Sequence, residues 1–501
     1  MSRPESALSG RIDESPSAAM AAKVRRAIAW RSGSQLAGQL VMWSSTFLVL
    51  RLLAPADYGL FAMTEVVIAF ASLMNGYSFA SALVQAEEIG EERVAQVFGM
   101  LLLLNFGLAA LQFVAAPQAA AYFRQPMVAD MLRVQCLFHL TTPFIIMPQA
   151  LLSRRIDFGT QAKVNLAAAA AAAVTAPAFA LAGAGVWTLV VAPLVLFSVR
   201  AIGLAVAGRW LLRPSFRFAG AGATFGFGGA VLVAELLWFV QSQADVFIAG
   251  RRMEAHDLGL YTTALFLAQI LVNKFVPALN EVAFPAYSRM QADRGAVAAG
   301  FARSVRLIML VAMPFCIGLA VAAEPLVLTM MGAKWAGTVP VVRLLALAMP
   351  FVTLQILYHP VTNALGRPAI GGWVSAAGAL IMPAAFWIGV GWGPVGMAWA
   401  WLAGFPLLLA VSSALSLPVI GLAARDVARA VRPSLVAALL MAALVLAADA
   451  ALPPLPQPTR LAVLVATGAA SYAAALWLVG RAALVELVAL VRGRTAPQLA
   501  I

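Results

Sequence analysis

The sequence predicts an all-α, polytopic membrane protein with about fourteen transmembrane helices. Composition is the first reason: 62% of the 501 residues are hydrophobic, only 11% are charged, and the mean hydropathy is +0.90. A soluble domain carries about 25% charged residues. The second reason is that apolar runs long enough to cross the hydrocarbon layer, about 20 residues each, recur along the chain. These runs are too long and too uniform for the strands of a membrane barrel.

Fourteen spans follow from these runs, taken in chain order. They lie near residues 32–53, 58–79, 94–116, 132–152, 161–182, 185–207, 220–243, 258–283, 301–323, 338–364, 368–390, 394–418, 431–451 and 460–480. No connecting loop exceeds about 25 residues, which leaves no room for a soluble catalytic domain on either face. The sequence therefore indicates a transporter rather than an enzyme.

The distribution of basic residues supports this count. With the N-terminus in the cytoplasm, about 25 basic residues fall inside and about 8 outside. Inside loops carry pairs such as Arg154 and Arg155, and the outside residues are chiefly Arg251 and Arg252. Cytoplasmic loops of membrane proteins are enriched in Lys and Arg. We therefore expect both termini to be cytoplasmic, and we assign the net charge of +13 to loops facing anionic lipid rather than to nucleic-acid binding.

Neither the two ends of the chain nor its cysteines and histidines indicate a catalytic or metal-binding site. Residues 1–27 lack the apolar core of a signal peptide and are expected to form a disordered cytoplasmic tail. Residues 481–501 begin with apolar residues at helical spacing between basic ends, typical of a helix on the inner membrane surface. Cys136 and Cys316 lie in apolar runs and the three histidines are scattered, so neither a metal site nor a cofactor is expected.

Polar residues inside the spans are the candidate functional residues, because a charge in the membrane is costly and usually faces a cavity or a partner. They occur early in each half of the chain: Arg31, Gln39, Glu65, Glu235, Asp245, Asn273, Lys274 and Glu281. Two interpretations remain open. Lys274 pairs with Glu235 or Glu281 and holds helices together, or these spans line a polar, partly cationic cavity.

Several segments, taken in order, carry a family resemblance. They include RLLAPADYGLFAM (51–63), LLSRRIDF (151–158), FIAGRRMEAHDLGLYTTA (247–264) and EPLVLTMMGAKW (324–335). Together they resemble the Wzx-type flippases for lipopolysaccharide and exopolysaccharide, within the multidrug/oligosaccharidyl-lipid/polysaccharide exporter superfamily. The resemblance covers about residues 25–420 and is weaker over the last two spans.

The resemblance implies a fold with internal pseudosymmetry around a central cavity. Two six-helix lobes are expected at 28–207 and 220–420, joined by a cytoplasmic linker at 208–219. Two further helices are expected within 421–480.

The resemblance also implies a function. Such proteins translocate oligosaccharide repeat units on undecaprenyl diphosphate across the bacterial inner membrane by alternating access, beside a polysaccharide polymerase and chain-length machinery. Cations that engage the diphosphate map onto Arg31 and Lys274. Glu65, Glu235 and Glu281 depart from a strongly basic cavity and are candidates for ion coupling.

Three alternative functions remain. A lipid II flippase and a drug or metabolite antiporter belong to the same superfamily, and cationic drugs would suit the acidic residues. A membrane polysaccharide polymerase is disfavoured because it would be expected to carry a large outside loop.

Overall fold

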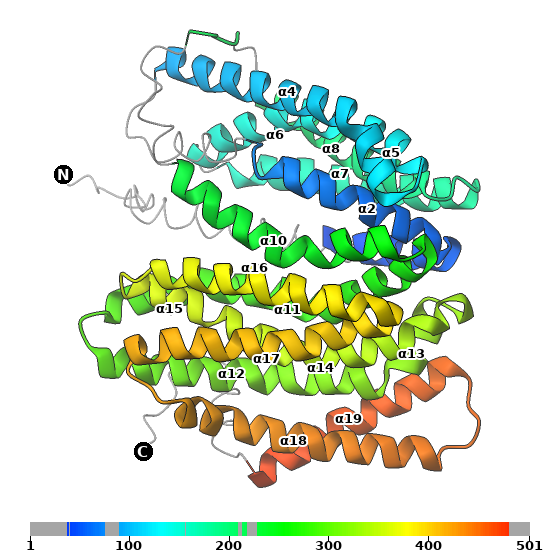
Figure 1. Cartoon of the computed structure of the whole chain (residues 1–501), viewed down its shortest axis with the longest axis vertical. Helices are drawn as coiled ribbons and strands as arrows, with labels where there is room; N and C mark the ends of the chain where they lie inside the picture. Colours follow the sequence, from blue (N-terminus) through cyan, green and yellow to red (C-terminus); the bar gives the residue numbers. More distant parts are fainter. Residues whose placement is uncertain are drawn as a thin grey trace, which may run out of the picture. The chain divides into compact units, whose positions relative to one another are not determined.

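The computed structural model describes residues 38–39, 41–75, 90–155, 157–208, 213–217 and 228–479, with backbone alone for 228–234 and 274–282. All regular elements in these ranges are helices, which confirms the all-α class (Figure 1). A helix lies in the described part of each predicted span. By length and composition, ten apolar stretches in the described residues could cross a membrane, and one of them, Ala369–Ile420, contains two long helices. The number fourteen therefore stays a prediction.

The described helices follow one another along the chain in this order. After a helix at Val41–Leu52 come α2 (Pro55–Ser72), α4 (Glu91–Phe123), α5 (Met127–Gln135), α6 (Leu137–Arg154), α7 (Phe158–Leu181), α8 (Trp187–Ala207), α10 (Gly228–Arg252), α11 (Ala255–Met290), α12 (Arg294–Val321), α13 (Ala323–Met330), α14 (Val339–Ile356), α15 (Tyr358–Ala364), α16 (Ala369–Gly389), α17 (Gly393–Ile420), α18 (Ala424–Ala451) and α19 (Gln457–Val479). Short 3₁₀ helices occupy Ala333–Thr338 and Val390–Trp392.

Several helix starts follow from local side-chain chemistry. The Asp157 carboxylate accepts a hydrogen bond from the backbone N–H of Thr160 at 3.1 Å, and Asp293 accepts one from Ala296 at 3.0 Å. Each carboxylate thereby satisfies an N–H group that the first turn of a helix leaves without an internal partner. These caps fix the starts of α7 and α12 on polar residues at the ends of apolar runs.

Packing divides the chain into two units. The first draws on residues 1–46, 74–114 and 133–219. Its helices α6, α7 and α8 pack on one another, and one of its cores joins Phe98 and Leu101 of α4 to Met147 of α6. Gly203 of α8 lies against Val164 of α7, where an added Cβ would be 2.7 Å from the valine side chain. Small residues at such contacts allow close helix packing, as is common in membrane bundles.

The second unit draws on residues 47–73, 115–132 and 220–501. One large hydrophobic core runs through it, with contributions from α2, α11, α12, α14, α16, α17 and α18. This unit contains segments of both predicted lobes, because 47–73 and 115–132 precede the predicted linker. The lobe boundaries themselves stay a prediction.

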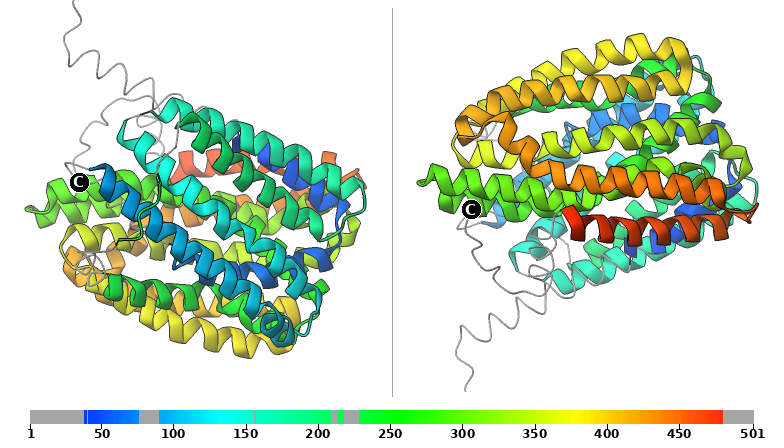
Figure 2. Two further views of the ribbon diagram at one scale, coloured as in Figure 1. Left: turned by 90° about the horizontal axis from the view of Figure 1, so that it is seen from above. Right: turned by 90° about the horizontal axis from the view of Figure 1, so that it is seen from below.

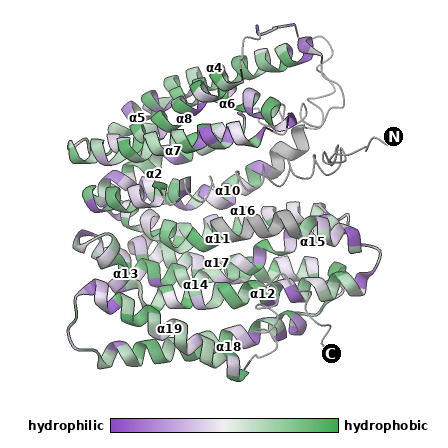
Figure 3. Cartoon of the chain, turned by 180° about the vertical axis from the view of Figure 1, so that it is seen from behind, coloured by the Kyte–Doolittle hydropathy of each residue, from purple (hydrophilic) through white to green (hydrophobic). Residues whose placement is uncertain are grey.

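The last two helices form a hairpin packed on the rest of the second unit. Helices α18 and α19 lie side by side and contact α12 (Figure 2). The Tyr472 hydroxyl of α19 donates a hydrogen bond to the Leu310 carbonyl of α12 at 2.8 Å. At one end of the hairpin, Arg460 binds both carboxylate oxygens of Asp449, at 2.6 and 2.7 Å, and lies 3.6 Å from Glu324. Hydrophobic residues predominate along both helices (Figure 3).

Candidate functional site

Five of the eight predicted site residues have described side chains, and these five fall into three groups. Glu65, Glu235 and Asn273 have exposed side chains on α2, α10 and α11, three helices that pack on one another. Asp245 is buried in α10 at 1% exposure. Gln39 belongs to the first unit and is half-buried.

The remaining candidates cannot be placed against these residues. Arg31 lies outside the described residues. Lys274 and Glu281 lie within α11, but their side chains are outside the described part of the chain. Whether Lys274 pairs with Glu235 or Glu281 therefore stays open.

Asp245 is the centre of a buried hydrogen-bond network in the second unit. Its Oδ2 accepts a bond from the Tyr261 hydroxyl at 2.7 Å, and its Oδ1 accepts one from the backbone N–H of Val246 at 2.7 Å. The indole Nε1 of Trp401 donates to the Tyr261 oxygen, also at 2.7 Å. A buried carboxylate needs such donors because its desolvation is costly. The network joins α10, α11 and α17, so a structural role for Asp245 is visible, whereas ion coupling stays a prediction.

The first unit contains a cation that the sequence analysis did not select. Arg200 lies in α8, inside the predicted sixth span, and one of its Nη atoms donates to Gln149 Oε1 at 3.0 Å. Gln161 is held nearby, with its amide donating to the Gln149 carbonyl at 3.1 Å and to Ser153 Oγ at 3.0 Å. The signal was present in the sequence, because an arginine within an apolar run is costly and therefore warrants a functional explanation.

Helices α2 and α11 make a backbone contact at Gly59 and Gly259. A Cβ atom on Gly59 would lie 1.8 Å from the Ala255 carbonyl oxygen, and one on Gly259 would lie 1.7 Å from that of Pro55. The contact is reciprocal. Gly59 lies against Ala255, four residues before Gly259, and Gly259 lies against Pro55, four residues before Gly59. We call it the glycine crossing. No side chain fits there, so α2 and α11 must separate if anything is to pass between them at this point.

Two short, similar segments of the sequence correspond to this symmetry. The segments RLLAPADYGL (51–60) and RRMEAHDLGL (251–260) align at a spacing of 200 residues, and the alignment pairs the two glycines. Taken separately, each segment indicates only the family. Taken together, the two segments identify the glycines that form the crossing. The predicted topology places the turns at 53–54 and 253–254 on the outer side.

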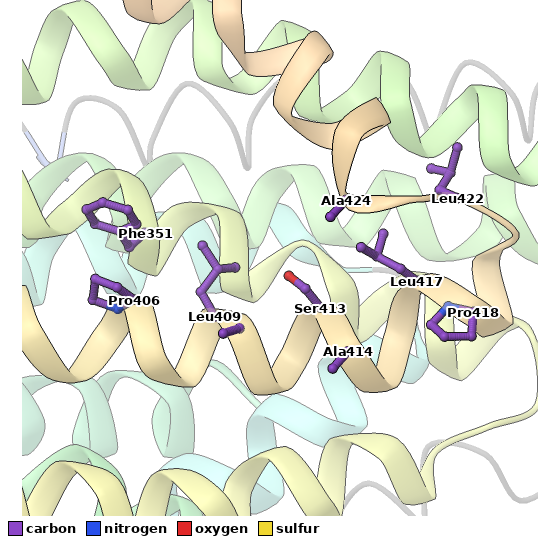
Figure 4. A pocket seen from close by; sticks show the side chains of 10 residues that line it. Phe351, Pro406, Leu409, Ser413, Ala414, Leu417, Pro418, Leu422 and Ala424 are labelled. Atoms are coloured by element: carbon purple, nitrogen blue, oxygen red, sulfur yellow. The ribbon is translucent and has the colours of Figure 1, made fainter.

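An apolar pocket of about 610 Å³ opens at another place in the second unit (Figure 4). Phe351 of α14, Leu409 and Leu417 of α17, and Ala424 at the start of α18 line it. Its polar residue, Ser413, shares a hydrogen bond of 3.0 Å with the Tyr358 hydroxyl. Such a lining suits hydrocarbon chains and offers no charged ligand group.

Comparison with known proteins assigns the chain to a family. The family model described as "Polysaccharide biosynthesis protein" matches residues 48–340, more than half of the chain and including both segments of the glycine crossing. The chain belongs to this polysaccharide biosynthesis family. The match confirms the family resemblance expected from the ordered segments.

Curated relatives of the chain are named for polysaccharide biosynthesis. The chain is 27% identical to the succinoglycan biosynthesis transport protein ExoT of Rhizobium meliloti, over 70% of this chain and 71% of that protein. It is 23% identical to the teichuronic acid biosynthesis protein TuaB of Bacillus subtilis, over 58% and 60%. It is 22% identical to the lipopolysaccharide biosynthesis protein WzxC of Escherichia coli, over 59% and 60%. For the latter two, the match spans less than two thirds of the relative's length.

Solved structures show which fold this family member has. The lipid II flippase MurJ, in an inward closed conformation, matches 90% of this chain and 98% of its own with a TM-score of 0.69 at 12% identity. An inward-facing multidrug resistance transporter of the MATE family, in the MOP superfamily, matches 81% of this chain and 99% of its own with a TM-score of 0.59, also at 12% identity. The expected exporter-superfamily fold is confirmed.

Proposed function

We propose that this protein is a flippase that moves lipid-linked oligosaccharide repeat units across a bacterial inner membrane for the assembly of a surface polysaccharide. The observation that carries the proposal is the family match over residues 48–340, on a chain with the fold of a lipid II flippase. The names of three relatives, which refer to succinoglycan, teichuronic acid and lipopolysaccharide, point to the same class of product.

The chemistry of such a substrate explains why a protein is needed. Each sugar hydroxyl buried without a partner costs about 4–8 kcal/mol relative to water when the surroundings are hydrocarbon. A hydrated cavity avoids that cost while the prenyl tail stays in lipid. The diphosphate needs cationic donors, which form charge-assisted hydrogen bonds with its oxygens. An anion that moves outward also gains about 2.3 kcal/mol per charge for each 100 mV of membrane potential.

The polar residues described above fit a hydrated cavity. Glu65, Glu235 and Asn273 are exposed on helices that are rich in apolar residues. Charged groups in that position are expected to face water or polar partners rather than lipid tails. We infer that these helices line the substrate path, with Lys274 and Arg31 as the diphosphate ligands.

The topology and the partner proteins follow from the same proposed function. We infer that both termini are cytoplasmic, that the protein catalyses no covalent step, and that a polysaccharide polymerase and chain-length machinery receive the flipped units. A reporter enzyme fused after Ile501 should be active on the cytoplasmic side. Activity on the outer side would contradict the topology.

The test of function is a deletion in the source bacterium. Loss of the protein should abolish a surface polysaccharide and leave lipid-linked repeat units in the inner leaflet, and a plasmid copy should restore export. Normal surface polymer in a deletion strain without a second flippase would refute the proposal. Rescue of a strain depleted of its lipid II flippase would instead assign the substrate to peptidoglycan synthesis.

A further inference from the structure

Two arginines, Arg51 and Arg251, reach the C-terminal ends of other helices in the same way. Arg51 is the last residue but one of the helix at 41–52, and its guanidinium donates to the carbonyls of Met330, at 3.0 Å from Nε, and of Thr329. These are the last two residues of α13. Arg251 lies at the end of α10, and its Nη1 donates to the Tyr122 carbonyl at 2.6 Å. Tyr122 is the last residue but one of α4.

The carbonyls at a helix C-terminus are a natural target for a cation. They have no partner within the helix and carry the negative end of the helix dipole. A guanidinium supplies both the missing donors and the opposite charge. Arg51 and Arg251 therefore cap α13 and α4 from outside those helices. We call these two residues the outer arginine pair.

The pair has the same two-fold relation as the glycine crossing. Arg51 and Arg251 occupy equivalent positions of the two aligned segments, eight residues before Gly59 and Gly259 respectively. Arg51 belongs to the first predicted lobe and caps a helix of the second, whereas Arg251 belongs to the second and caps a helix of the first. Each cap thus ties together segments from both halves of the chain.

Other contacts reinforce the caps unequally. On the Arg51 side, Trp335 Nε1 donates to the Leu50 carbonyl at 2.8 Å, and the Tyr58 ring packs edge-on against the indole at 5.5 Å. On the Arg251 side, the guanidinium lies 4.9 Å from the centre of the Tyr122 ring. Arg51 makes two hydrogen bonds to α13, and Arg251 makes one to α4. The Arg51 side is therefore the stronger of the two.

We propose that Arg51 and Arg251 are gating residues of the transport cycle, which hold the outer end closed by capping α13 and α4 and release these helices when that end opens. The proposal rests on the flippase function proposed above. Oligosaccharide cannot pass where the backbones of Gly59 and Gly259 touch, so the outer end must open by moving α2 from α11. That movement separates the two halves and breaks both caps, so the strength of the caps sets how often the outer end opens.

The experiment measures opening directly, with a cysteine that is buried when the outer end is closed. Met63 is fully buried, and its side chain lies 3.3 Å from the Cβ position of Gly250. Met63→Cys, in a chain with Cys136→Ala and Cys316→Ala, is labelled in intact cells with a membrane-impermeant maleimide. Arg51→Gln and Arg251→Gln are then introduced singly and together.

The matched control is Arg252→Gln. Arg252 is also exposed at the end of α10, but its guanidinium lies 3.8 Å from the centre of the Trp387 ring of α16, within the same half of the chain. The substitution removes the same charge one residue away without removing a cap. It should leave both labelling and export near the parent level.

Each arginine substitution should raise the labelling rate about three- to ten-fold, the range for losing an ionic hydrogen bond that is partly screened by solvent. Arg51→Gln should have the larger effect, the double variant a larger one still, and Arg51→Lys should restore part of the protection because lysine can donate to the same carbonyls. Membrane protein levels should stay constant. Labelling no faster than in Arg252→Gln would overturn the proposal and leave the flippase function untouched. Faster labelling in a protein that exports no polysaccharide in any background would uphold the gate and overturn the function.

Discussion

Replacing Gly59 with alanine would place a methyl carbon 1.8 Å from the carbonyl oxygen of Ala255 and 2.7 Å from its carbon. Carbon–oxygen contacts in proteins begin at about 3.3 Å. The backbones of α2 and α11 must therefore part by roughly 1.5 Å, and no flexible side chain is present to absorb the change. Overpacking of this kind costs about 1–3 kcal/mol, and a contact between two backbones belongs at the upper end.

The effect on unfolding is smaller than the effect on opening. Alanine is a better helix former than glycine by about 1 kcal/mol, but α2 is a helix whether the outer end is open or closed, so this gain stabilises both states equally and leaves the full strain of about 3 kcal/mol against the closed state. At 1.4 kcal/mol for each factor of ten, the ratio of open to closed molecules rises roughly a hundred-fold. Gly259→Ala should act similarly, since its Cβ would lie 1.7 Å from the Pro55 oxygen. The double variant should add little, because one separation relieves both clashes.

The assay is maleimide labelling of Met63→Cys in intact cells, with thermal unfolding of the purified protein alongside. Gly372→Ala in α16 is the control, because a Cβ there meets nothing within 4 Å and brings only the gain in helix propensity. Wild-type labelling together with wild-type stability in Gly59→Ala would refute the reasoning, since the backbones would then not be in contact.

Three other expectations concern separate parts of the molecule. Tyr261→Phe removes the hydroxyl that donates to Asp245, and should lower stability by about 1–3 kcal/mol in thermal unfolding; an unchanged midpoint would show that the carboxylate has other donors. Arg460→Ala breaks the two bonds to Asp449 and should cost only about 1 kcal/mol, because both groups are partly exposed; a midpoint shift several times larger would contradict this. Lys274→Ala should abolish export at a normal protein level while Lys274→Arg retains some, and full export by a well-inserted alanine variant would remove the residue from the mechanism.

The features that the sequence predicted are those set by local composition. Each apolar run produced a helix because its length and hydropathy are properties of consecutive residues. The Asp245 network was not predicted, because Trp401 lies 140 residues beyond Tyr261 and nothing local indicates their contact. The sequence also does not show where the Asp245 side chain points, because an acidic residue in an apolar helix can face either a water-filled cavity or a buried hydrogen-bond network.

Other parts of the site were within reach of sequence reasoning. Arg200 could have been selected by the rule that selected Lys274, because both are cations inside predicted spans. The partners of Arg51 could not, since a bond to a backbone carbonyl leaves no trace in the identity of Thr329 or Met330. Contacts with main-chain atoms between distant segments depend on how the helices pack, and only the three-dimensional structure shows them.

The reciprocal contact of Gly59 and Gly259 is the kind that two identical subunits make across a dyad, where one patch meets its own copy. In a homodimer of half-length chains, a single glycine would serve both sides of this contact. Duplication and fusion of such a chain would free the two copies to differ. The sequences around the crossing do differ: Asp245 and Tyr261 align, at the same spacing of 200 residues, with Ser45 and Phe61. The buried hydrogen bond between Tyr261 and Asp245 therefore occurs in one half of the chain only. In a homodimer, both subunits would carry the same hydrogen bond.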